Sequence, residues 1–363
     1  MSKRKFFGIV LLTLLLFLVV VGGYVVYVFL AYDRLPKRME LKIFPPKEES
    51  EGVTALQVGV EYNAVTYNIG FGAYTPDFSF FMDGGTESVA ASAESVTAAV
   101  DGAARCVHRL EPDFALFQEV DLKATRSHYV NEFALINRLF PEYWRIFAVN
   151  YDSPFLFYPI LEPHGRTKAG MATYSRFPIE TAVRRALPIS ENFDKFFDLD
   201  RCFSVVTVPV ENGKKLVVFH VHLSAYSEDA RIREGQTNLL MHSLDAAYRS
   251  GNYVLCAGDF NHDMKNLTQA ADEVFSWAHV FPRESLPKHF FIVQDLFSEK
   301  EKAAMPDSSR NADIPYIPGE TMTITLDAFI VSDNIEPINY RIINHGFLYS
   351  DHQPVEFSFR LKN

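Results

Sequence analysis

The chain has 363 residues, a formal net charge of −10 and a hydrophobic share of 48% that includes 32 Phe. A chain of this length forms one large domain or two ordinary ones, and its apolar content can fill a sizeable core. The acidic balance excludes a broad attraction to nucleic acid, because binding to the phosphate backbone depends on Lys and Arg, but it does not exclude a local basic patch. The three cysteines are widely spaced without a CxxC pair, so we expect small core residues and no disulfide framework.

The N-terminus combines a basic cluster with a long apolar run. Lys3, Arg4 and Lys5 precede an uncharged segment, residues 6–32, which exceeds the roughly 20 residues that a helix needs to cross a bilayer. A cleaved signal peptide is the alternative, but its apolar core is about 7–15 residues long and ends at a small-residue site that we do not see here. The basic cluster favours a cytosolic N-terminus. The expected order is a cytosolic basic stub (1–5), a transmembrane signal anchor (6–32), a tether (33–52) and an extracytoplasmic catalytic domain (53–363).

After the tether, strand-like and helix-like segments mix without repeats, which favours one α/β domain with mixed sheets. Short apolar runs bounded by turn residues predict strands at residues 64–70, 114–120, 144–150, 169–175, 204–210, 216–224, 253–260, 324–331 and 354–361. Helical spacing of apolar residues predicts helices at 95–110, 130–140 and 231–248. The sequence ENGK at residues 211–214 predicts a hairpin turn. Residues 75–94 and 279–323 are expected to be long insertions, and loops of that size often bind ligands.

Polar side chains recur at the ends of the predicted strands. The run VLCA at residues 254–257 is apolar, yet Asp259 and Asn261 follow it closely, and buried polar groups cost free energy unless something binds them. Other strand ends carry Asn68, Glu119, His220, His222, Asp327, Asp351 and His352. One such residue alone is most often a structural group, but the repetition along the chain favours a shared site. Their oxygens suit Mg²⁺, Mn²⁺ or Ca²⁺, and the absence of Cys among them argues against structural zinc.

This combination of groups is typical of metal-assisted hydrolysis of a phosphoester. Histidines supply acid and base groups near neutral pH, and a hard cation stabilises the charge of the phosphate. His220 and His222 lie on one face of their strand, so spacing alone does not choose between them. For His262 and Asp263 we expect loop groups that are solvated or that cap their own backbone.

Several short segments resemble the endonuclease/exonuclease/phosphatase superfamily, whose fold is that of deoxyribonuclease I. TYNI, FQEV, YSRFPI, HLS, GDFN, LDAFIVS and SDHQPV occur in the family's order within residues 64–359. The resemblance implies an α/β fold, a four-layer α/β sandwich with two mixed β-sheets and the active site at one edge of the sheets. It also implies a metal site at Glu119, with Asn68 and Asp351 beside it. Mg²⁺ is the expected ion, with Mn²⁺ or Ca²⁺ as alternatives.

The same resemblance implies catalytic roles. Asp259 would orient or deprotonate the attacking water, and Asn261 would donate its amide to the phosphate. His352, oriented by Asp327, would contact the scissile phosphate. His222 corresponds to the family's histidine, because it precedes Leu223 and Ser224. Weaker candidates for binding an anionic substrate, each with a solvated surface role as the alternative, are Arg126, Asn150, Tyr151, Arg166 and Lys168, with Arg201, Arg233 and Gln236 as supporting residues.

The sequence therefore predicts a membrane-anchored, divalent-metal-dependent phosphoesterase that hydrolyses a phosphodiester. Anchoring beside a bilayer and aromatic segments at residues 76–81 and 289–291 favour a lipid head group or another envelope phosphodiester. One alternative is an extracellular nuclease, for which nucleic acid would be a substrate only. Another is a non-catalytic phosphate-binding protein on the same fold, against which the complete set of catalytic residues argues. No obligate protein partner is indicated.

Overall fold

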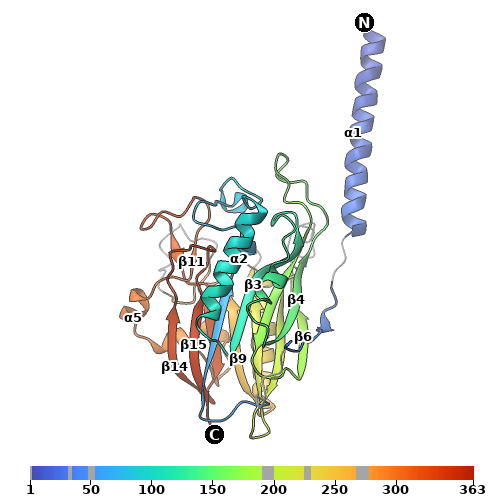
Figure 1. The fold of residues 1–363 in the computed structure, drawn as a ribbon. Coiled ribbons are helices and arrows are strands. Elements are labelled where there is room, and N and C mark those ends of the chain that lie inside the picture. Colours follow the sequence, from blue (N-terminus) through green and yellow to red (C-terminus); the bar gives the residue numbers. More distant parts are fainter. Residues whose placement is uncertain (1, 32–34, 48–53, 190–199, 225–229, 267–277) are drawn as a thin grey trace.

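The computed structural model describes residues 2–31, 35–47, 54–189, 200–224, 230–266 and 278–363. Helix α1 (Lys3–Ala31) stands outside a domain made of two sheets and their covering helices (Figure 1). Its 29 residues span about 43 Å at 1.5 Å per residue, more than the roughly 30 Å of a bilayer's hydrocarbon core. In the described part of the chain it is the one helix that is long and apolar enough to cross a membrane.

The first sheet has seven strands and contains one parallel pair, β8 with β9. Its order is β1 (Arg38–Glu40), β6 (Thr181–Ala186), β7 (Cys202–Pro209), β8 (Lys215–His222), β9 (Tyr253–Asp259), β13 (Asp327–Ser332) and β10 (Phe290–Ile292). The predicted turn at residues 211–214 is confirmed, since it joins the antiparallel strands β7 and β8 with Gly213 at φ +81°. A left-handed φ of this kind favours glycine.

The second sheet has six strands and also contains one parallel pair, β2 with β3. Its order is β14 (Ile335–Ile342), β15 (Val355–Leu361), β2 (Glu61–Asn68), β3 (Phe114–Ala124), β5 (Thr167–Ser175) and β4 (Trp144–Asp152). A separate two-stranded ribbon joins β11 (Ser309–Arg310) to β12 (Thr323–Ile324). Both large sheets are mixed, as predicted.

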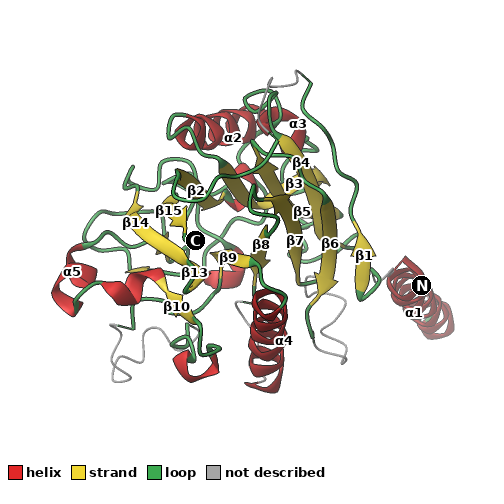
Figure 2. Cartoon of the chain, turned by 90° about the horizontal axis from the view of Figure 1, so that it is seen from below, coloured by secondary structure: helices red, strands yellow, loops and turns green. Residues whose placement is uncertain are grey.

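The two sheets pack face to face, and helices cover both outer faces (Figure 2). Apolar side chains from both sheets, such as Leu116, Val218 and Phe357, form the central core. Helices α2 (Ala93–His108) and α3 (Glu132–Ile136) cover the six-stranded sheet, and α4 (Ala230–Arg249) covers the seven-stranded sheet. A short helix, α5 (Glu299–Ala304), lies in the segment after β10. The result is the predicted four-layer sandwich.

Some predicted elements differ from the structure. The helix expected at residues 130–140 is only the five residues of α3, which Asn131 caps by accepting a hydrogen bond from the Ala134 amide. The strand expected at residues 324–331 is broken between β12 and β13. The expected insertion at residues 279–323 contains β10, an edge strand of the large sheet, in addition to loop.

Besides β10 and β11 within the expected insertion, strands β1, β6 and β14 have no counterpart in the prediction. Strand β14 is an edge strand with a register shift between Pro337 and Asn339, so its alternation of apolar residues is irregular. Strand β1 lies in the expected tether and pairs with β6, and Phe44 bridges to Arg145. The described part of the tether is therefore docked on the domain.

The two parallel pairs determine where the polar strand ends meet. Parallel strands present their carboxyl ends at one edge, which is where open α/β sheets bind ligands. Strand β2 ends at Asn68 and β9 ends at Asp259, and the antiparallel β13 begins at Asp327 directly opposite Asp259. We call this the site edge. The C-terminus lies at the opposite edge (Figure 1).

Candidate active site

The two sheets are joined at the site edge by the side chain of Asn68. Its amide nitrogen donates to Oδ2 of Asp259 over 3.0 Å and to Oε1 of Glu119 over 3.2 Å. Its oxygen accepts from the Gly70 amide over 3.0 Å. Asn68 and Glu119 come from one sheet and Asp259 from the other, so the packing of the sheets assembles the site.

Glu119 owes its position to a bulge in β3. The pairing of β3 with β5 shifts register between Phe117 and Val120, and Glu119 has φ +54°, which is uncommon for a non-glycine residue. A bulge of this kind redirects a side chain and is frequent beside active sites. The Glu119 side chain remains 24% exposed, whereas Asp259 beside it is buried.

Asp259, His352 and Asp327 form a buried chain of charged groups. His352 donates from Nδ1 to Oδ2 of Asp327 over 2.7 Å, and its Nε2 lies 3.7 Å from Oδ2 of Asp259. Ser308 donates to the same Asp327 oxygen over 2.7 Å. The bond to Nδ1 therefore fixes the ring of His352 so that Nε2 faces the site.

The charges of this chain depend on one another. Burial alone would lower the pKa of His352, but Asp327 and Asp259 outweigh it and raise that pKa well above its usual value. Burial raises the pKa of Asp259 to about 7, although the positive His352 opposes the shift. His352 is therefore charged at neutral pH, while Asp259 can gain or lose a proton near neutral pH.

The two histidines of β8 have different environments. Nε2 of His222 lies 3.6 Å from Oδ2 of Asp259 and 3.9 Å from Oε1 of Glu119, and burial lowers its pKa well below the usual value. His220 is enclosed between the sheets, where it bonds Gln118 and Thr173, and burial lowers its pKa to about 3. The structure therefore places His222 at the site and His220 in the core.

The loop after β9 largely satisfies its own polar groups. The Asn261 backbone amide donates to Oδ1 of Asp259 over 2.8 Å, and its side-chain nitrogen donates to the Leu223 carbonyl over 2.8 Å. His262 bonds the Phe260 carbonyl, and Oδ1 of Asp263 accepts from the Lys265 amide. The expected self-capping of His262 and Asp263 is confirmed, although both are buried and not solvated.

A family model described as Endonuclease/Exonuclease/phosphatase family matches residues 65–300. This chain belongs to the endonuclease/exonuclease/phosphatase family. The match includes Asn68, Glu119, His222 and Asp259, while Asp327 and His352 follow it in the chain and reach the site through the fold. A search of curated proteins finds no match.

Solved structures with this fold are similar over most of the chain. A family protein from Beutenbergia cavernae DSM 12333 is 17% identical, with a TM-score of 0.56 over 84% of this chain and 72% of that one. The human Nocturnin catalytic domain with bound sulfate anion is 18% identical, with a TM-score of 0.52 over 83% and 95%. D. rerio TDP2 complexed with single strand DNA product is 14% identical, with a TM-score of 0.52 over 83% and 99%. They confirm the deoxyribonuclease I-like fold of the family.

The oxygen groups at the site fit a hard divalent cation. Burial raises the pKa of Glu119, Arg126 opposes the shift, and the negative charge of Asp351 raises it further. These two carboxylates repel each other, and a cation that they bound would reduce that repulsion. The amide nitrogen of Asn68 faces Glu119 and donates a hydrogen bond to it. For Asn68 to bind a cation held by Glu119, its side-chain amide would have to be rotated so that the oxygen takes the place of the nitrogen.

A second group could also offer ligand atoms to a metal. Atoms of Asp259, Asp327 and His352 all lie within 4.8 Å of one another. However, Nδ1 of His352 and Ser308 both donate to Oδ2 of Asp327, and His352 is positively charged. The hydrogen bonds and the charge therefore favour a proton-handling role for this group.

The weaker candidates for substrate binding fall into two sets. Arg126 and Tyr151 are buried on the Glu119 side of the site, but Arg126 forms a two-point ion pair with Asp121 and lies 3.8 Å from the Phe71 ring centroid. Asn150 is buried, with its side-chain nitrogen lacking a hydrogen-bond partner in the described part of the chain. The exposed Arg166 and Lys168 pair with Asp152 on the surface.

Two residues near the site were not assigned a definite role from the sequence. Ser308 lies in an expected insertion, and its tie to Asp327 has no local sequence signal. Arg201 is buried just before β7, and its charge contributes to the low pKa of His222. Among the described residues, two of its guanidinium nitrogens, Nε and Nη1, have no hydrogen-bond partner. Its position shortly before the predicted strand at residues 204–210 is the available sequence signal.

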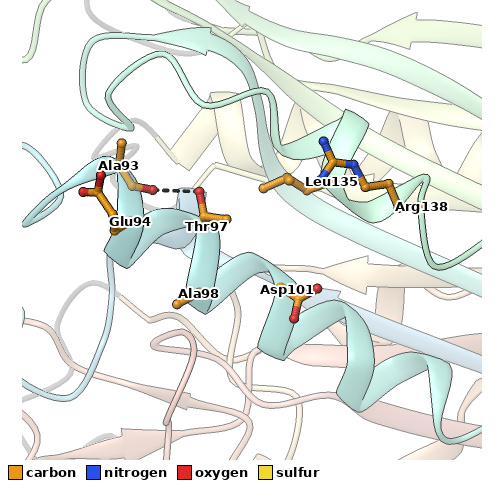
Figure 3. Close-up of a pocket in the computed structure, with 7 residues that line it drawn as sticks. All are labelled: Ala93, Glu94, Thr97, Ala98, Asp101, Leu135 and Arg138. Atoms are coloured by element: carbon orange, nitrogen blue, oxygen red, sulfur yellow. Dashed lines mark hydrogen bonds between the residues drawn. The ribbon is translucent and has the colours of Figure 1, made fainter.

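A separate hollow lies on the outer helical layer, away from these residues. Figure 3 shows side chains of α2, with Thr97 bonded to the Ala93 carbonyl, facing Leu135 and Arg138 across it. The hollow is lined by Ala93, Glu94, Thr97, Ala98, Asp101, Leu135 and Arg138. None of the predicted site residues lines this hollow, so we keep the site edge as the candidate catalytic centre.

Proposed function

We propose that the protein is a divalent-metal-dependent phosphoester hydrolase, anchored to a membrane by α1, that acts on a phosphodiester. The observation that carries the proposal is the buried chain from Asp259 through His352 to Asp327, next to Glu119. A purely phosphate-binding protein needs positive charge and donors. It does not need a buried carboxylate held in place by Asn68 and the Asn261 amide beside a histidine that a second carboxylate orients.

In this proposal Asp259 accepts the proton of the attacking water while the water oxygen bonds to phosphorus. The P–O bond to one alcohol breaks, and the leaving alkoxide takes up a proton from solvent. Asn68 and the Asn261 amide hold its two oxygens, so the carboxylate is oriented before substrate arrives. Charged His352 presents Nε2 to the phosphate and stabilises the negative charge that grows on its oxygens during in-line attack. Asp327 keeps His352 charged and oriented, and is a positioning residue.

The other predicted residues complete the site. Glu119 and Asp351 would hold the cation, with Asn68 beside them, and the bound cation would polarise the phosphoester and neutralise its charge. Mg²⁺ is the proposed ion, with Mn²⁺ or Ca²⁺ as alternatives. Neutral His222 would contact phosphate oxygens, as would the second N–H of the Asn261 side-chain amide, whose nitrogen also donates to the Leu223 carbonyl. Arg201 is buried, and two of its guanidinium nitrogens have no hydrogen-bond partner among the described residues, so it is suited to contact the same anion.

For the substrate we propose a lipid head group or another envelope phosphodiester. The supporting observations are the apolar α1 beside the domain and the net charge of −10, which gives no broad attraction to nucleic acid. An extracellular nuclease is the alternative. The similarity to a TDP2 structure with a single-strand DNA product is the reason to include DNA among the substrates tested.

The test is a substrate panel for the purified full-length chain in detergent. Sphingomyelin, phosphatidylinositol, phosphatidylcholine, single-stranded DNA and an inositol phosphate would each be assayed with Mg²⁺ and with excess chelator. We expect metal-dependent turnover of a lipid. Turnover of DNA alone would favour the nuclease, and no hydrolysis of any phosphoester, with the fold intact, would contradict the proposal.

The membrane topology has its own test. We propose a cytosolic N-terminus, a single span at residues 6–32 and a catalytic domain outside the cytosol, because Lys3, Arg4 and Lys5 precede the apolar run. Protease added to intact cells should digest the domain while a cytosolic marker survives. Equal protection of both proteins would contradict this orientation.

A further inference from the structure

The loop between β4 and β5 carries a cluster of exposed apolar side chains. Its tip, residues 155–161, has the sequence FLFYPIL, and the exposed fractions are 57% for Phe157, 66% for Tyr158, 83% for Ile160 and 99% for Leu161. Single exposed apolar residues are ordinary, but a contiguous group of large ones marks an interaction surface. We call residues 155–161 the apolar loop.

The base of the apolar loop is held to the domain. The backbones of Leu156 and Gly165 exchange two hydrogen bonds of 3.1 and 3.0 Å. The Ser88 amide donates to Oε2 of Glu162 over 3.1 Å, and the Tyr158 ring packs against Phe81 at 5.7 Å between centroids. The exposed tip is therefore presented by an ordered base.

The apolar loop also contacts the C-terminal part of α1. The Tyr24 hydroxyl donates to the Phe155 carbonyl over 3.0 Å, and the Phe155 amide donates to the Tyr27 hydroxyl over 3.1 Å. The rings of Tyr24 and Phe157 pack edge to face at 5.0 Å. Figure 1 shows this loop rising beside the C-terminal turns of α1, at the end of the domain opposite the C-terminus.

These contacts show where the apolar loop lies along the axis of α1. Tyr24 precedes the last residue of α1, Ala31, by seven positions, which is about 10 Å along the axis. If α1 crosses a bilayer, the apolar loop lies at the level of its last turns and not in bulk water. Tyr24, Tyr27 and Tyr158 then lie where tyrosines are enriched, at the boundary between lipid and water.

We propose that the apolar loop inserts into the same membrane leaflet as the C-terminal turns of α1 and holds the site edge against the bilayer. The occupant of this surface is lipid. Side chains as large and apolar as Ile160 and Leu161 gain free energy by leaving water, and the helix beside them ends in that leaflet. The inference rests on the anchor in the proposed function and not on the reaction, so it can stand if the substrate is different.

The test uses a fluorophore on the loop of the full-length chain in phosphatidylcholine vesicles. Leu161→Cys, and separately Ile160→Cys, would be made with Cys106→Ser and labelled with a polarity-sensitive dye. The matched control is Val60→Cys, exposed at the opposite edge, where the Gly59 amide bonds the Leu361 carbonyl. Vesicles with and without a spin-labelled phosphatidylcholine would be compared at low and at high protein-to-lipid ratio.

We expect the dye at residues 160 and 161 to emit at shorter wavelength than the dye at residue 60. Spin-labelled lipid should quench the loop dyes several-fold more than the control. Equal quenching at the loop and at residue 60 would overturn the proposal. So would a wavelength shift that appears only at high protein-to-lipid ratio, because that result would identify a second copy of the chain as the occupant.

Discussion

Asn68 at the end of β2 donates to Asp259 at the end of β9 over 3.0 Å, and this bond links the two sheets at the site edge. Because the same amide nitrogen also bonds Glu119, one side chain sets the spacing between the proposed proton acceptor and the proposed metal ligand. We therefore expect Asn68→Ala to lower kcat/KM by about 10–100-fold, as loss of an orienting partner does.

Steady-state kinetics of Asn68→Ala on one phosphodiester would check this. Asn339→Ala on the exposed edge strand β14 is the control and should match the wild type. Wild-type kinetics for Asn68→Ala would show that the link between the sheets does not organise the site.

His352 and Asp327 should act as one unit. We expect His352→Ala to lower kcat/KM by roughly 10²–10⁴-fold, because it removes the charged group at the phosphate. Asp327→Asn should lower kcat/KM by a smaller factor. The double variant should have a kcat/KM only slightly below that of His352→Ala, because the effects of substitutions in residues that act as a unit do not add. All three variants would be measured on one substrate at saturating Mg²⁺.

The control for this series is His289→Ala, which removes an exposed histidine paired with Asp333. It should leave kcat/KM close to the wild-type value. Additive losses from His352→Ala and Asp327→Asn would show that the two residues work independently, which contradicts the role of Asp327 as a positioning residue.

A substitution of Arg126 distinguishes two roles for this buried side chain, stabilising the fold and binding the substrate. Its guanidinium donates twice to Asp121, so Arg126→Met leaves a buried carboxylate without that partner. We expect the free energy of unfolding to fall by about 3–5 kcal/mol. The matched control is Arg105→Met, which removes an exposed pair with Asp101 and should cost about 0–1 kcal/mol. Unchanged stability in urea denaturation together with a raised KM would instead support the substrate-binding role.

His220 should make the domain less stable in mild acid. Its pKa is lowered to about 3 by burial, from the usual 6.5, so the unfolded chain binds more protons between these values. The contribution of neutral His220 to the free energy of unfolding is complete above pH 6.5 and is lost as the pH falls toward 3. From pH 7 to pH 5 the loss is about 2 kcal/mol. In urea denaturation, His220→Gln should therefore lose less stability than the wild type over this interval, and an equal loss in both would contradict the prediction.

Much of the fold could be predicted because strand ends and apolar periodicity are local signals. The runs at β3, β8 and β9 are apolar, and the polar residues that follow them mark the carboxyl ends of strands. The parallel pairs then bring these ends to one edge. The short α3 and the edge strands β1 and β14 could not be predicted, because packing and pairing, not local pattern, decide where they begin and end.

The details of the site depend on contacts that are distant in sequence. Glu119 faces the site because a bulge breaks the alternation of β3, and strict alternation does not predict that. Ser308 reaches Asp327 from an expected insertion. Arg126 has a sequence position that suits substrate binding, yet Asp121 and Phe71 enclose it. The roles of Ser308 and Arg126 can be assigned only when the residues that they contact are known.

The most direct test of the proposed chemistry is a Mg²⁺ titration of the full-length chain with bis(4-nitrophenyl) phosphate, before and after treatment with chelator. We expect no turnover in excess chelator, recovery on adding Mg²⁺, and a half-saturating Mg²⁺ concentration that is higher by about tenfold or more in Glu119→Gln. Glu211→Gln, distant from the site edge at the hairpin turn, should titrate like the wild type. Full turnover by the wild type in excess chelator would contradict metal-dependent hydrolysis at this site.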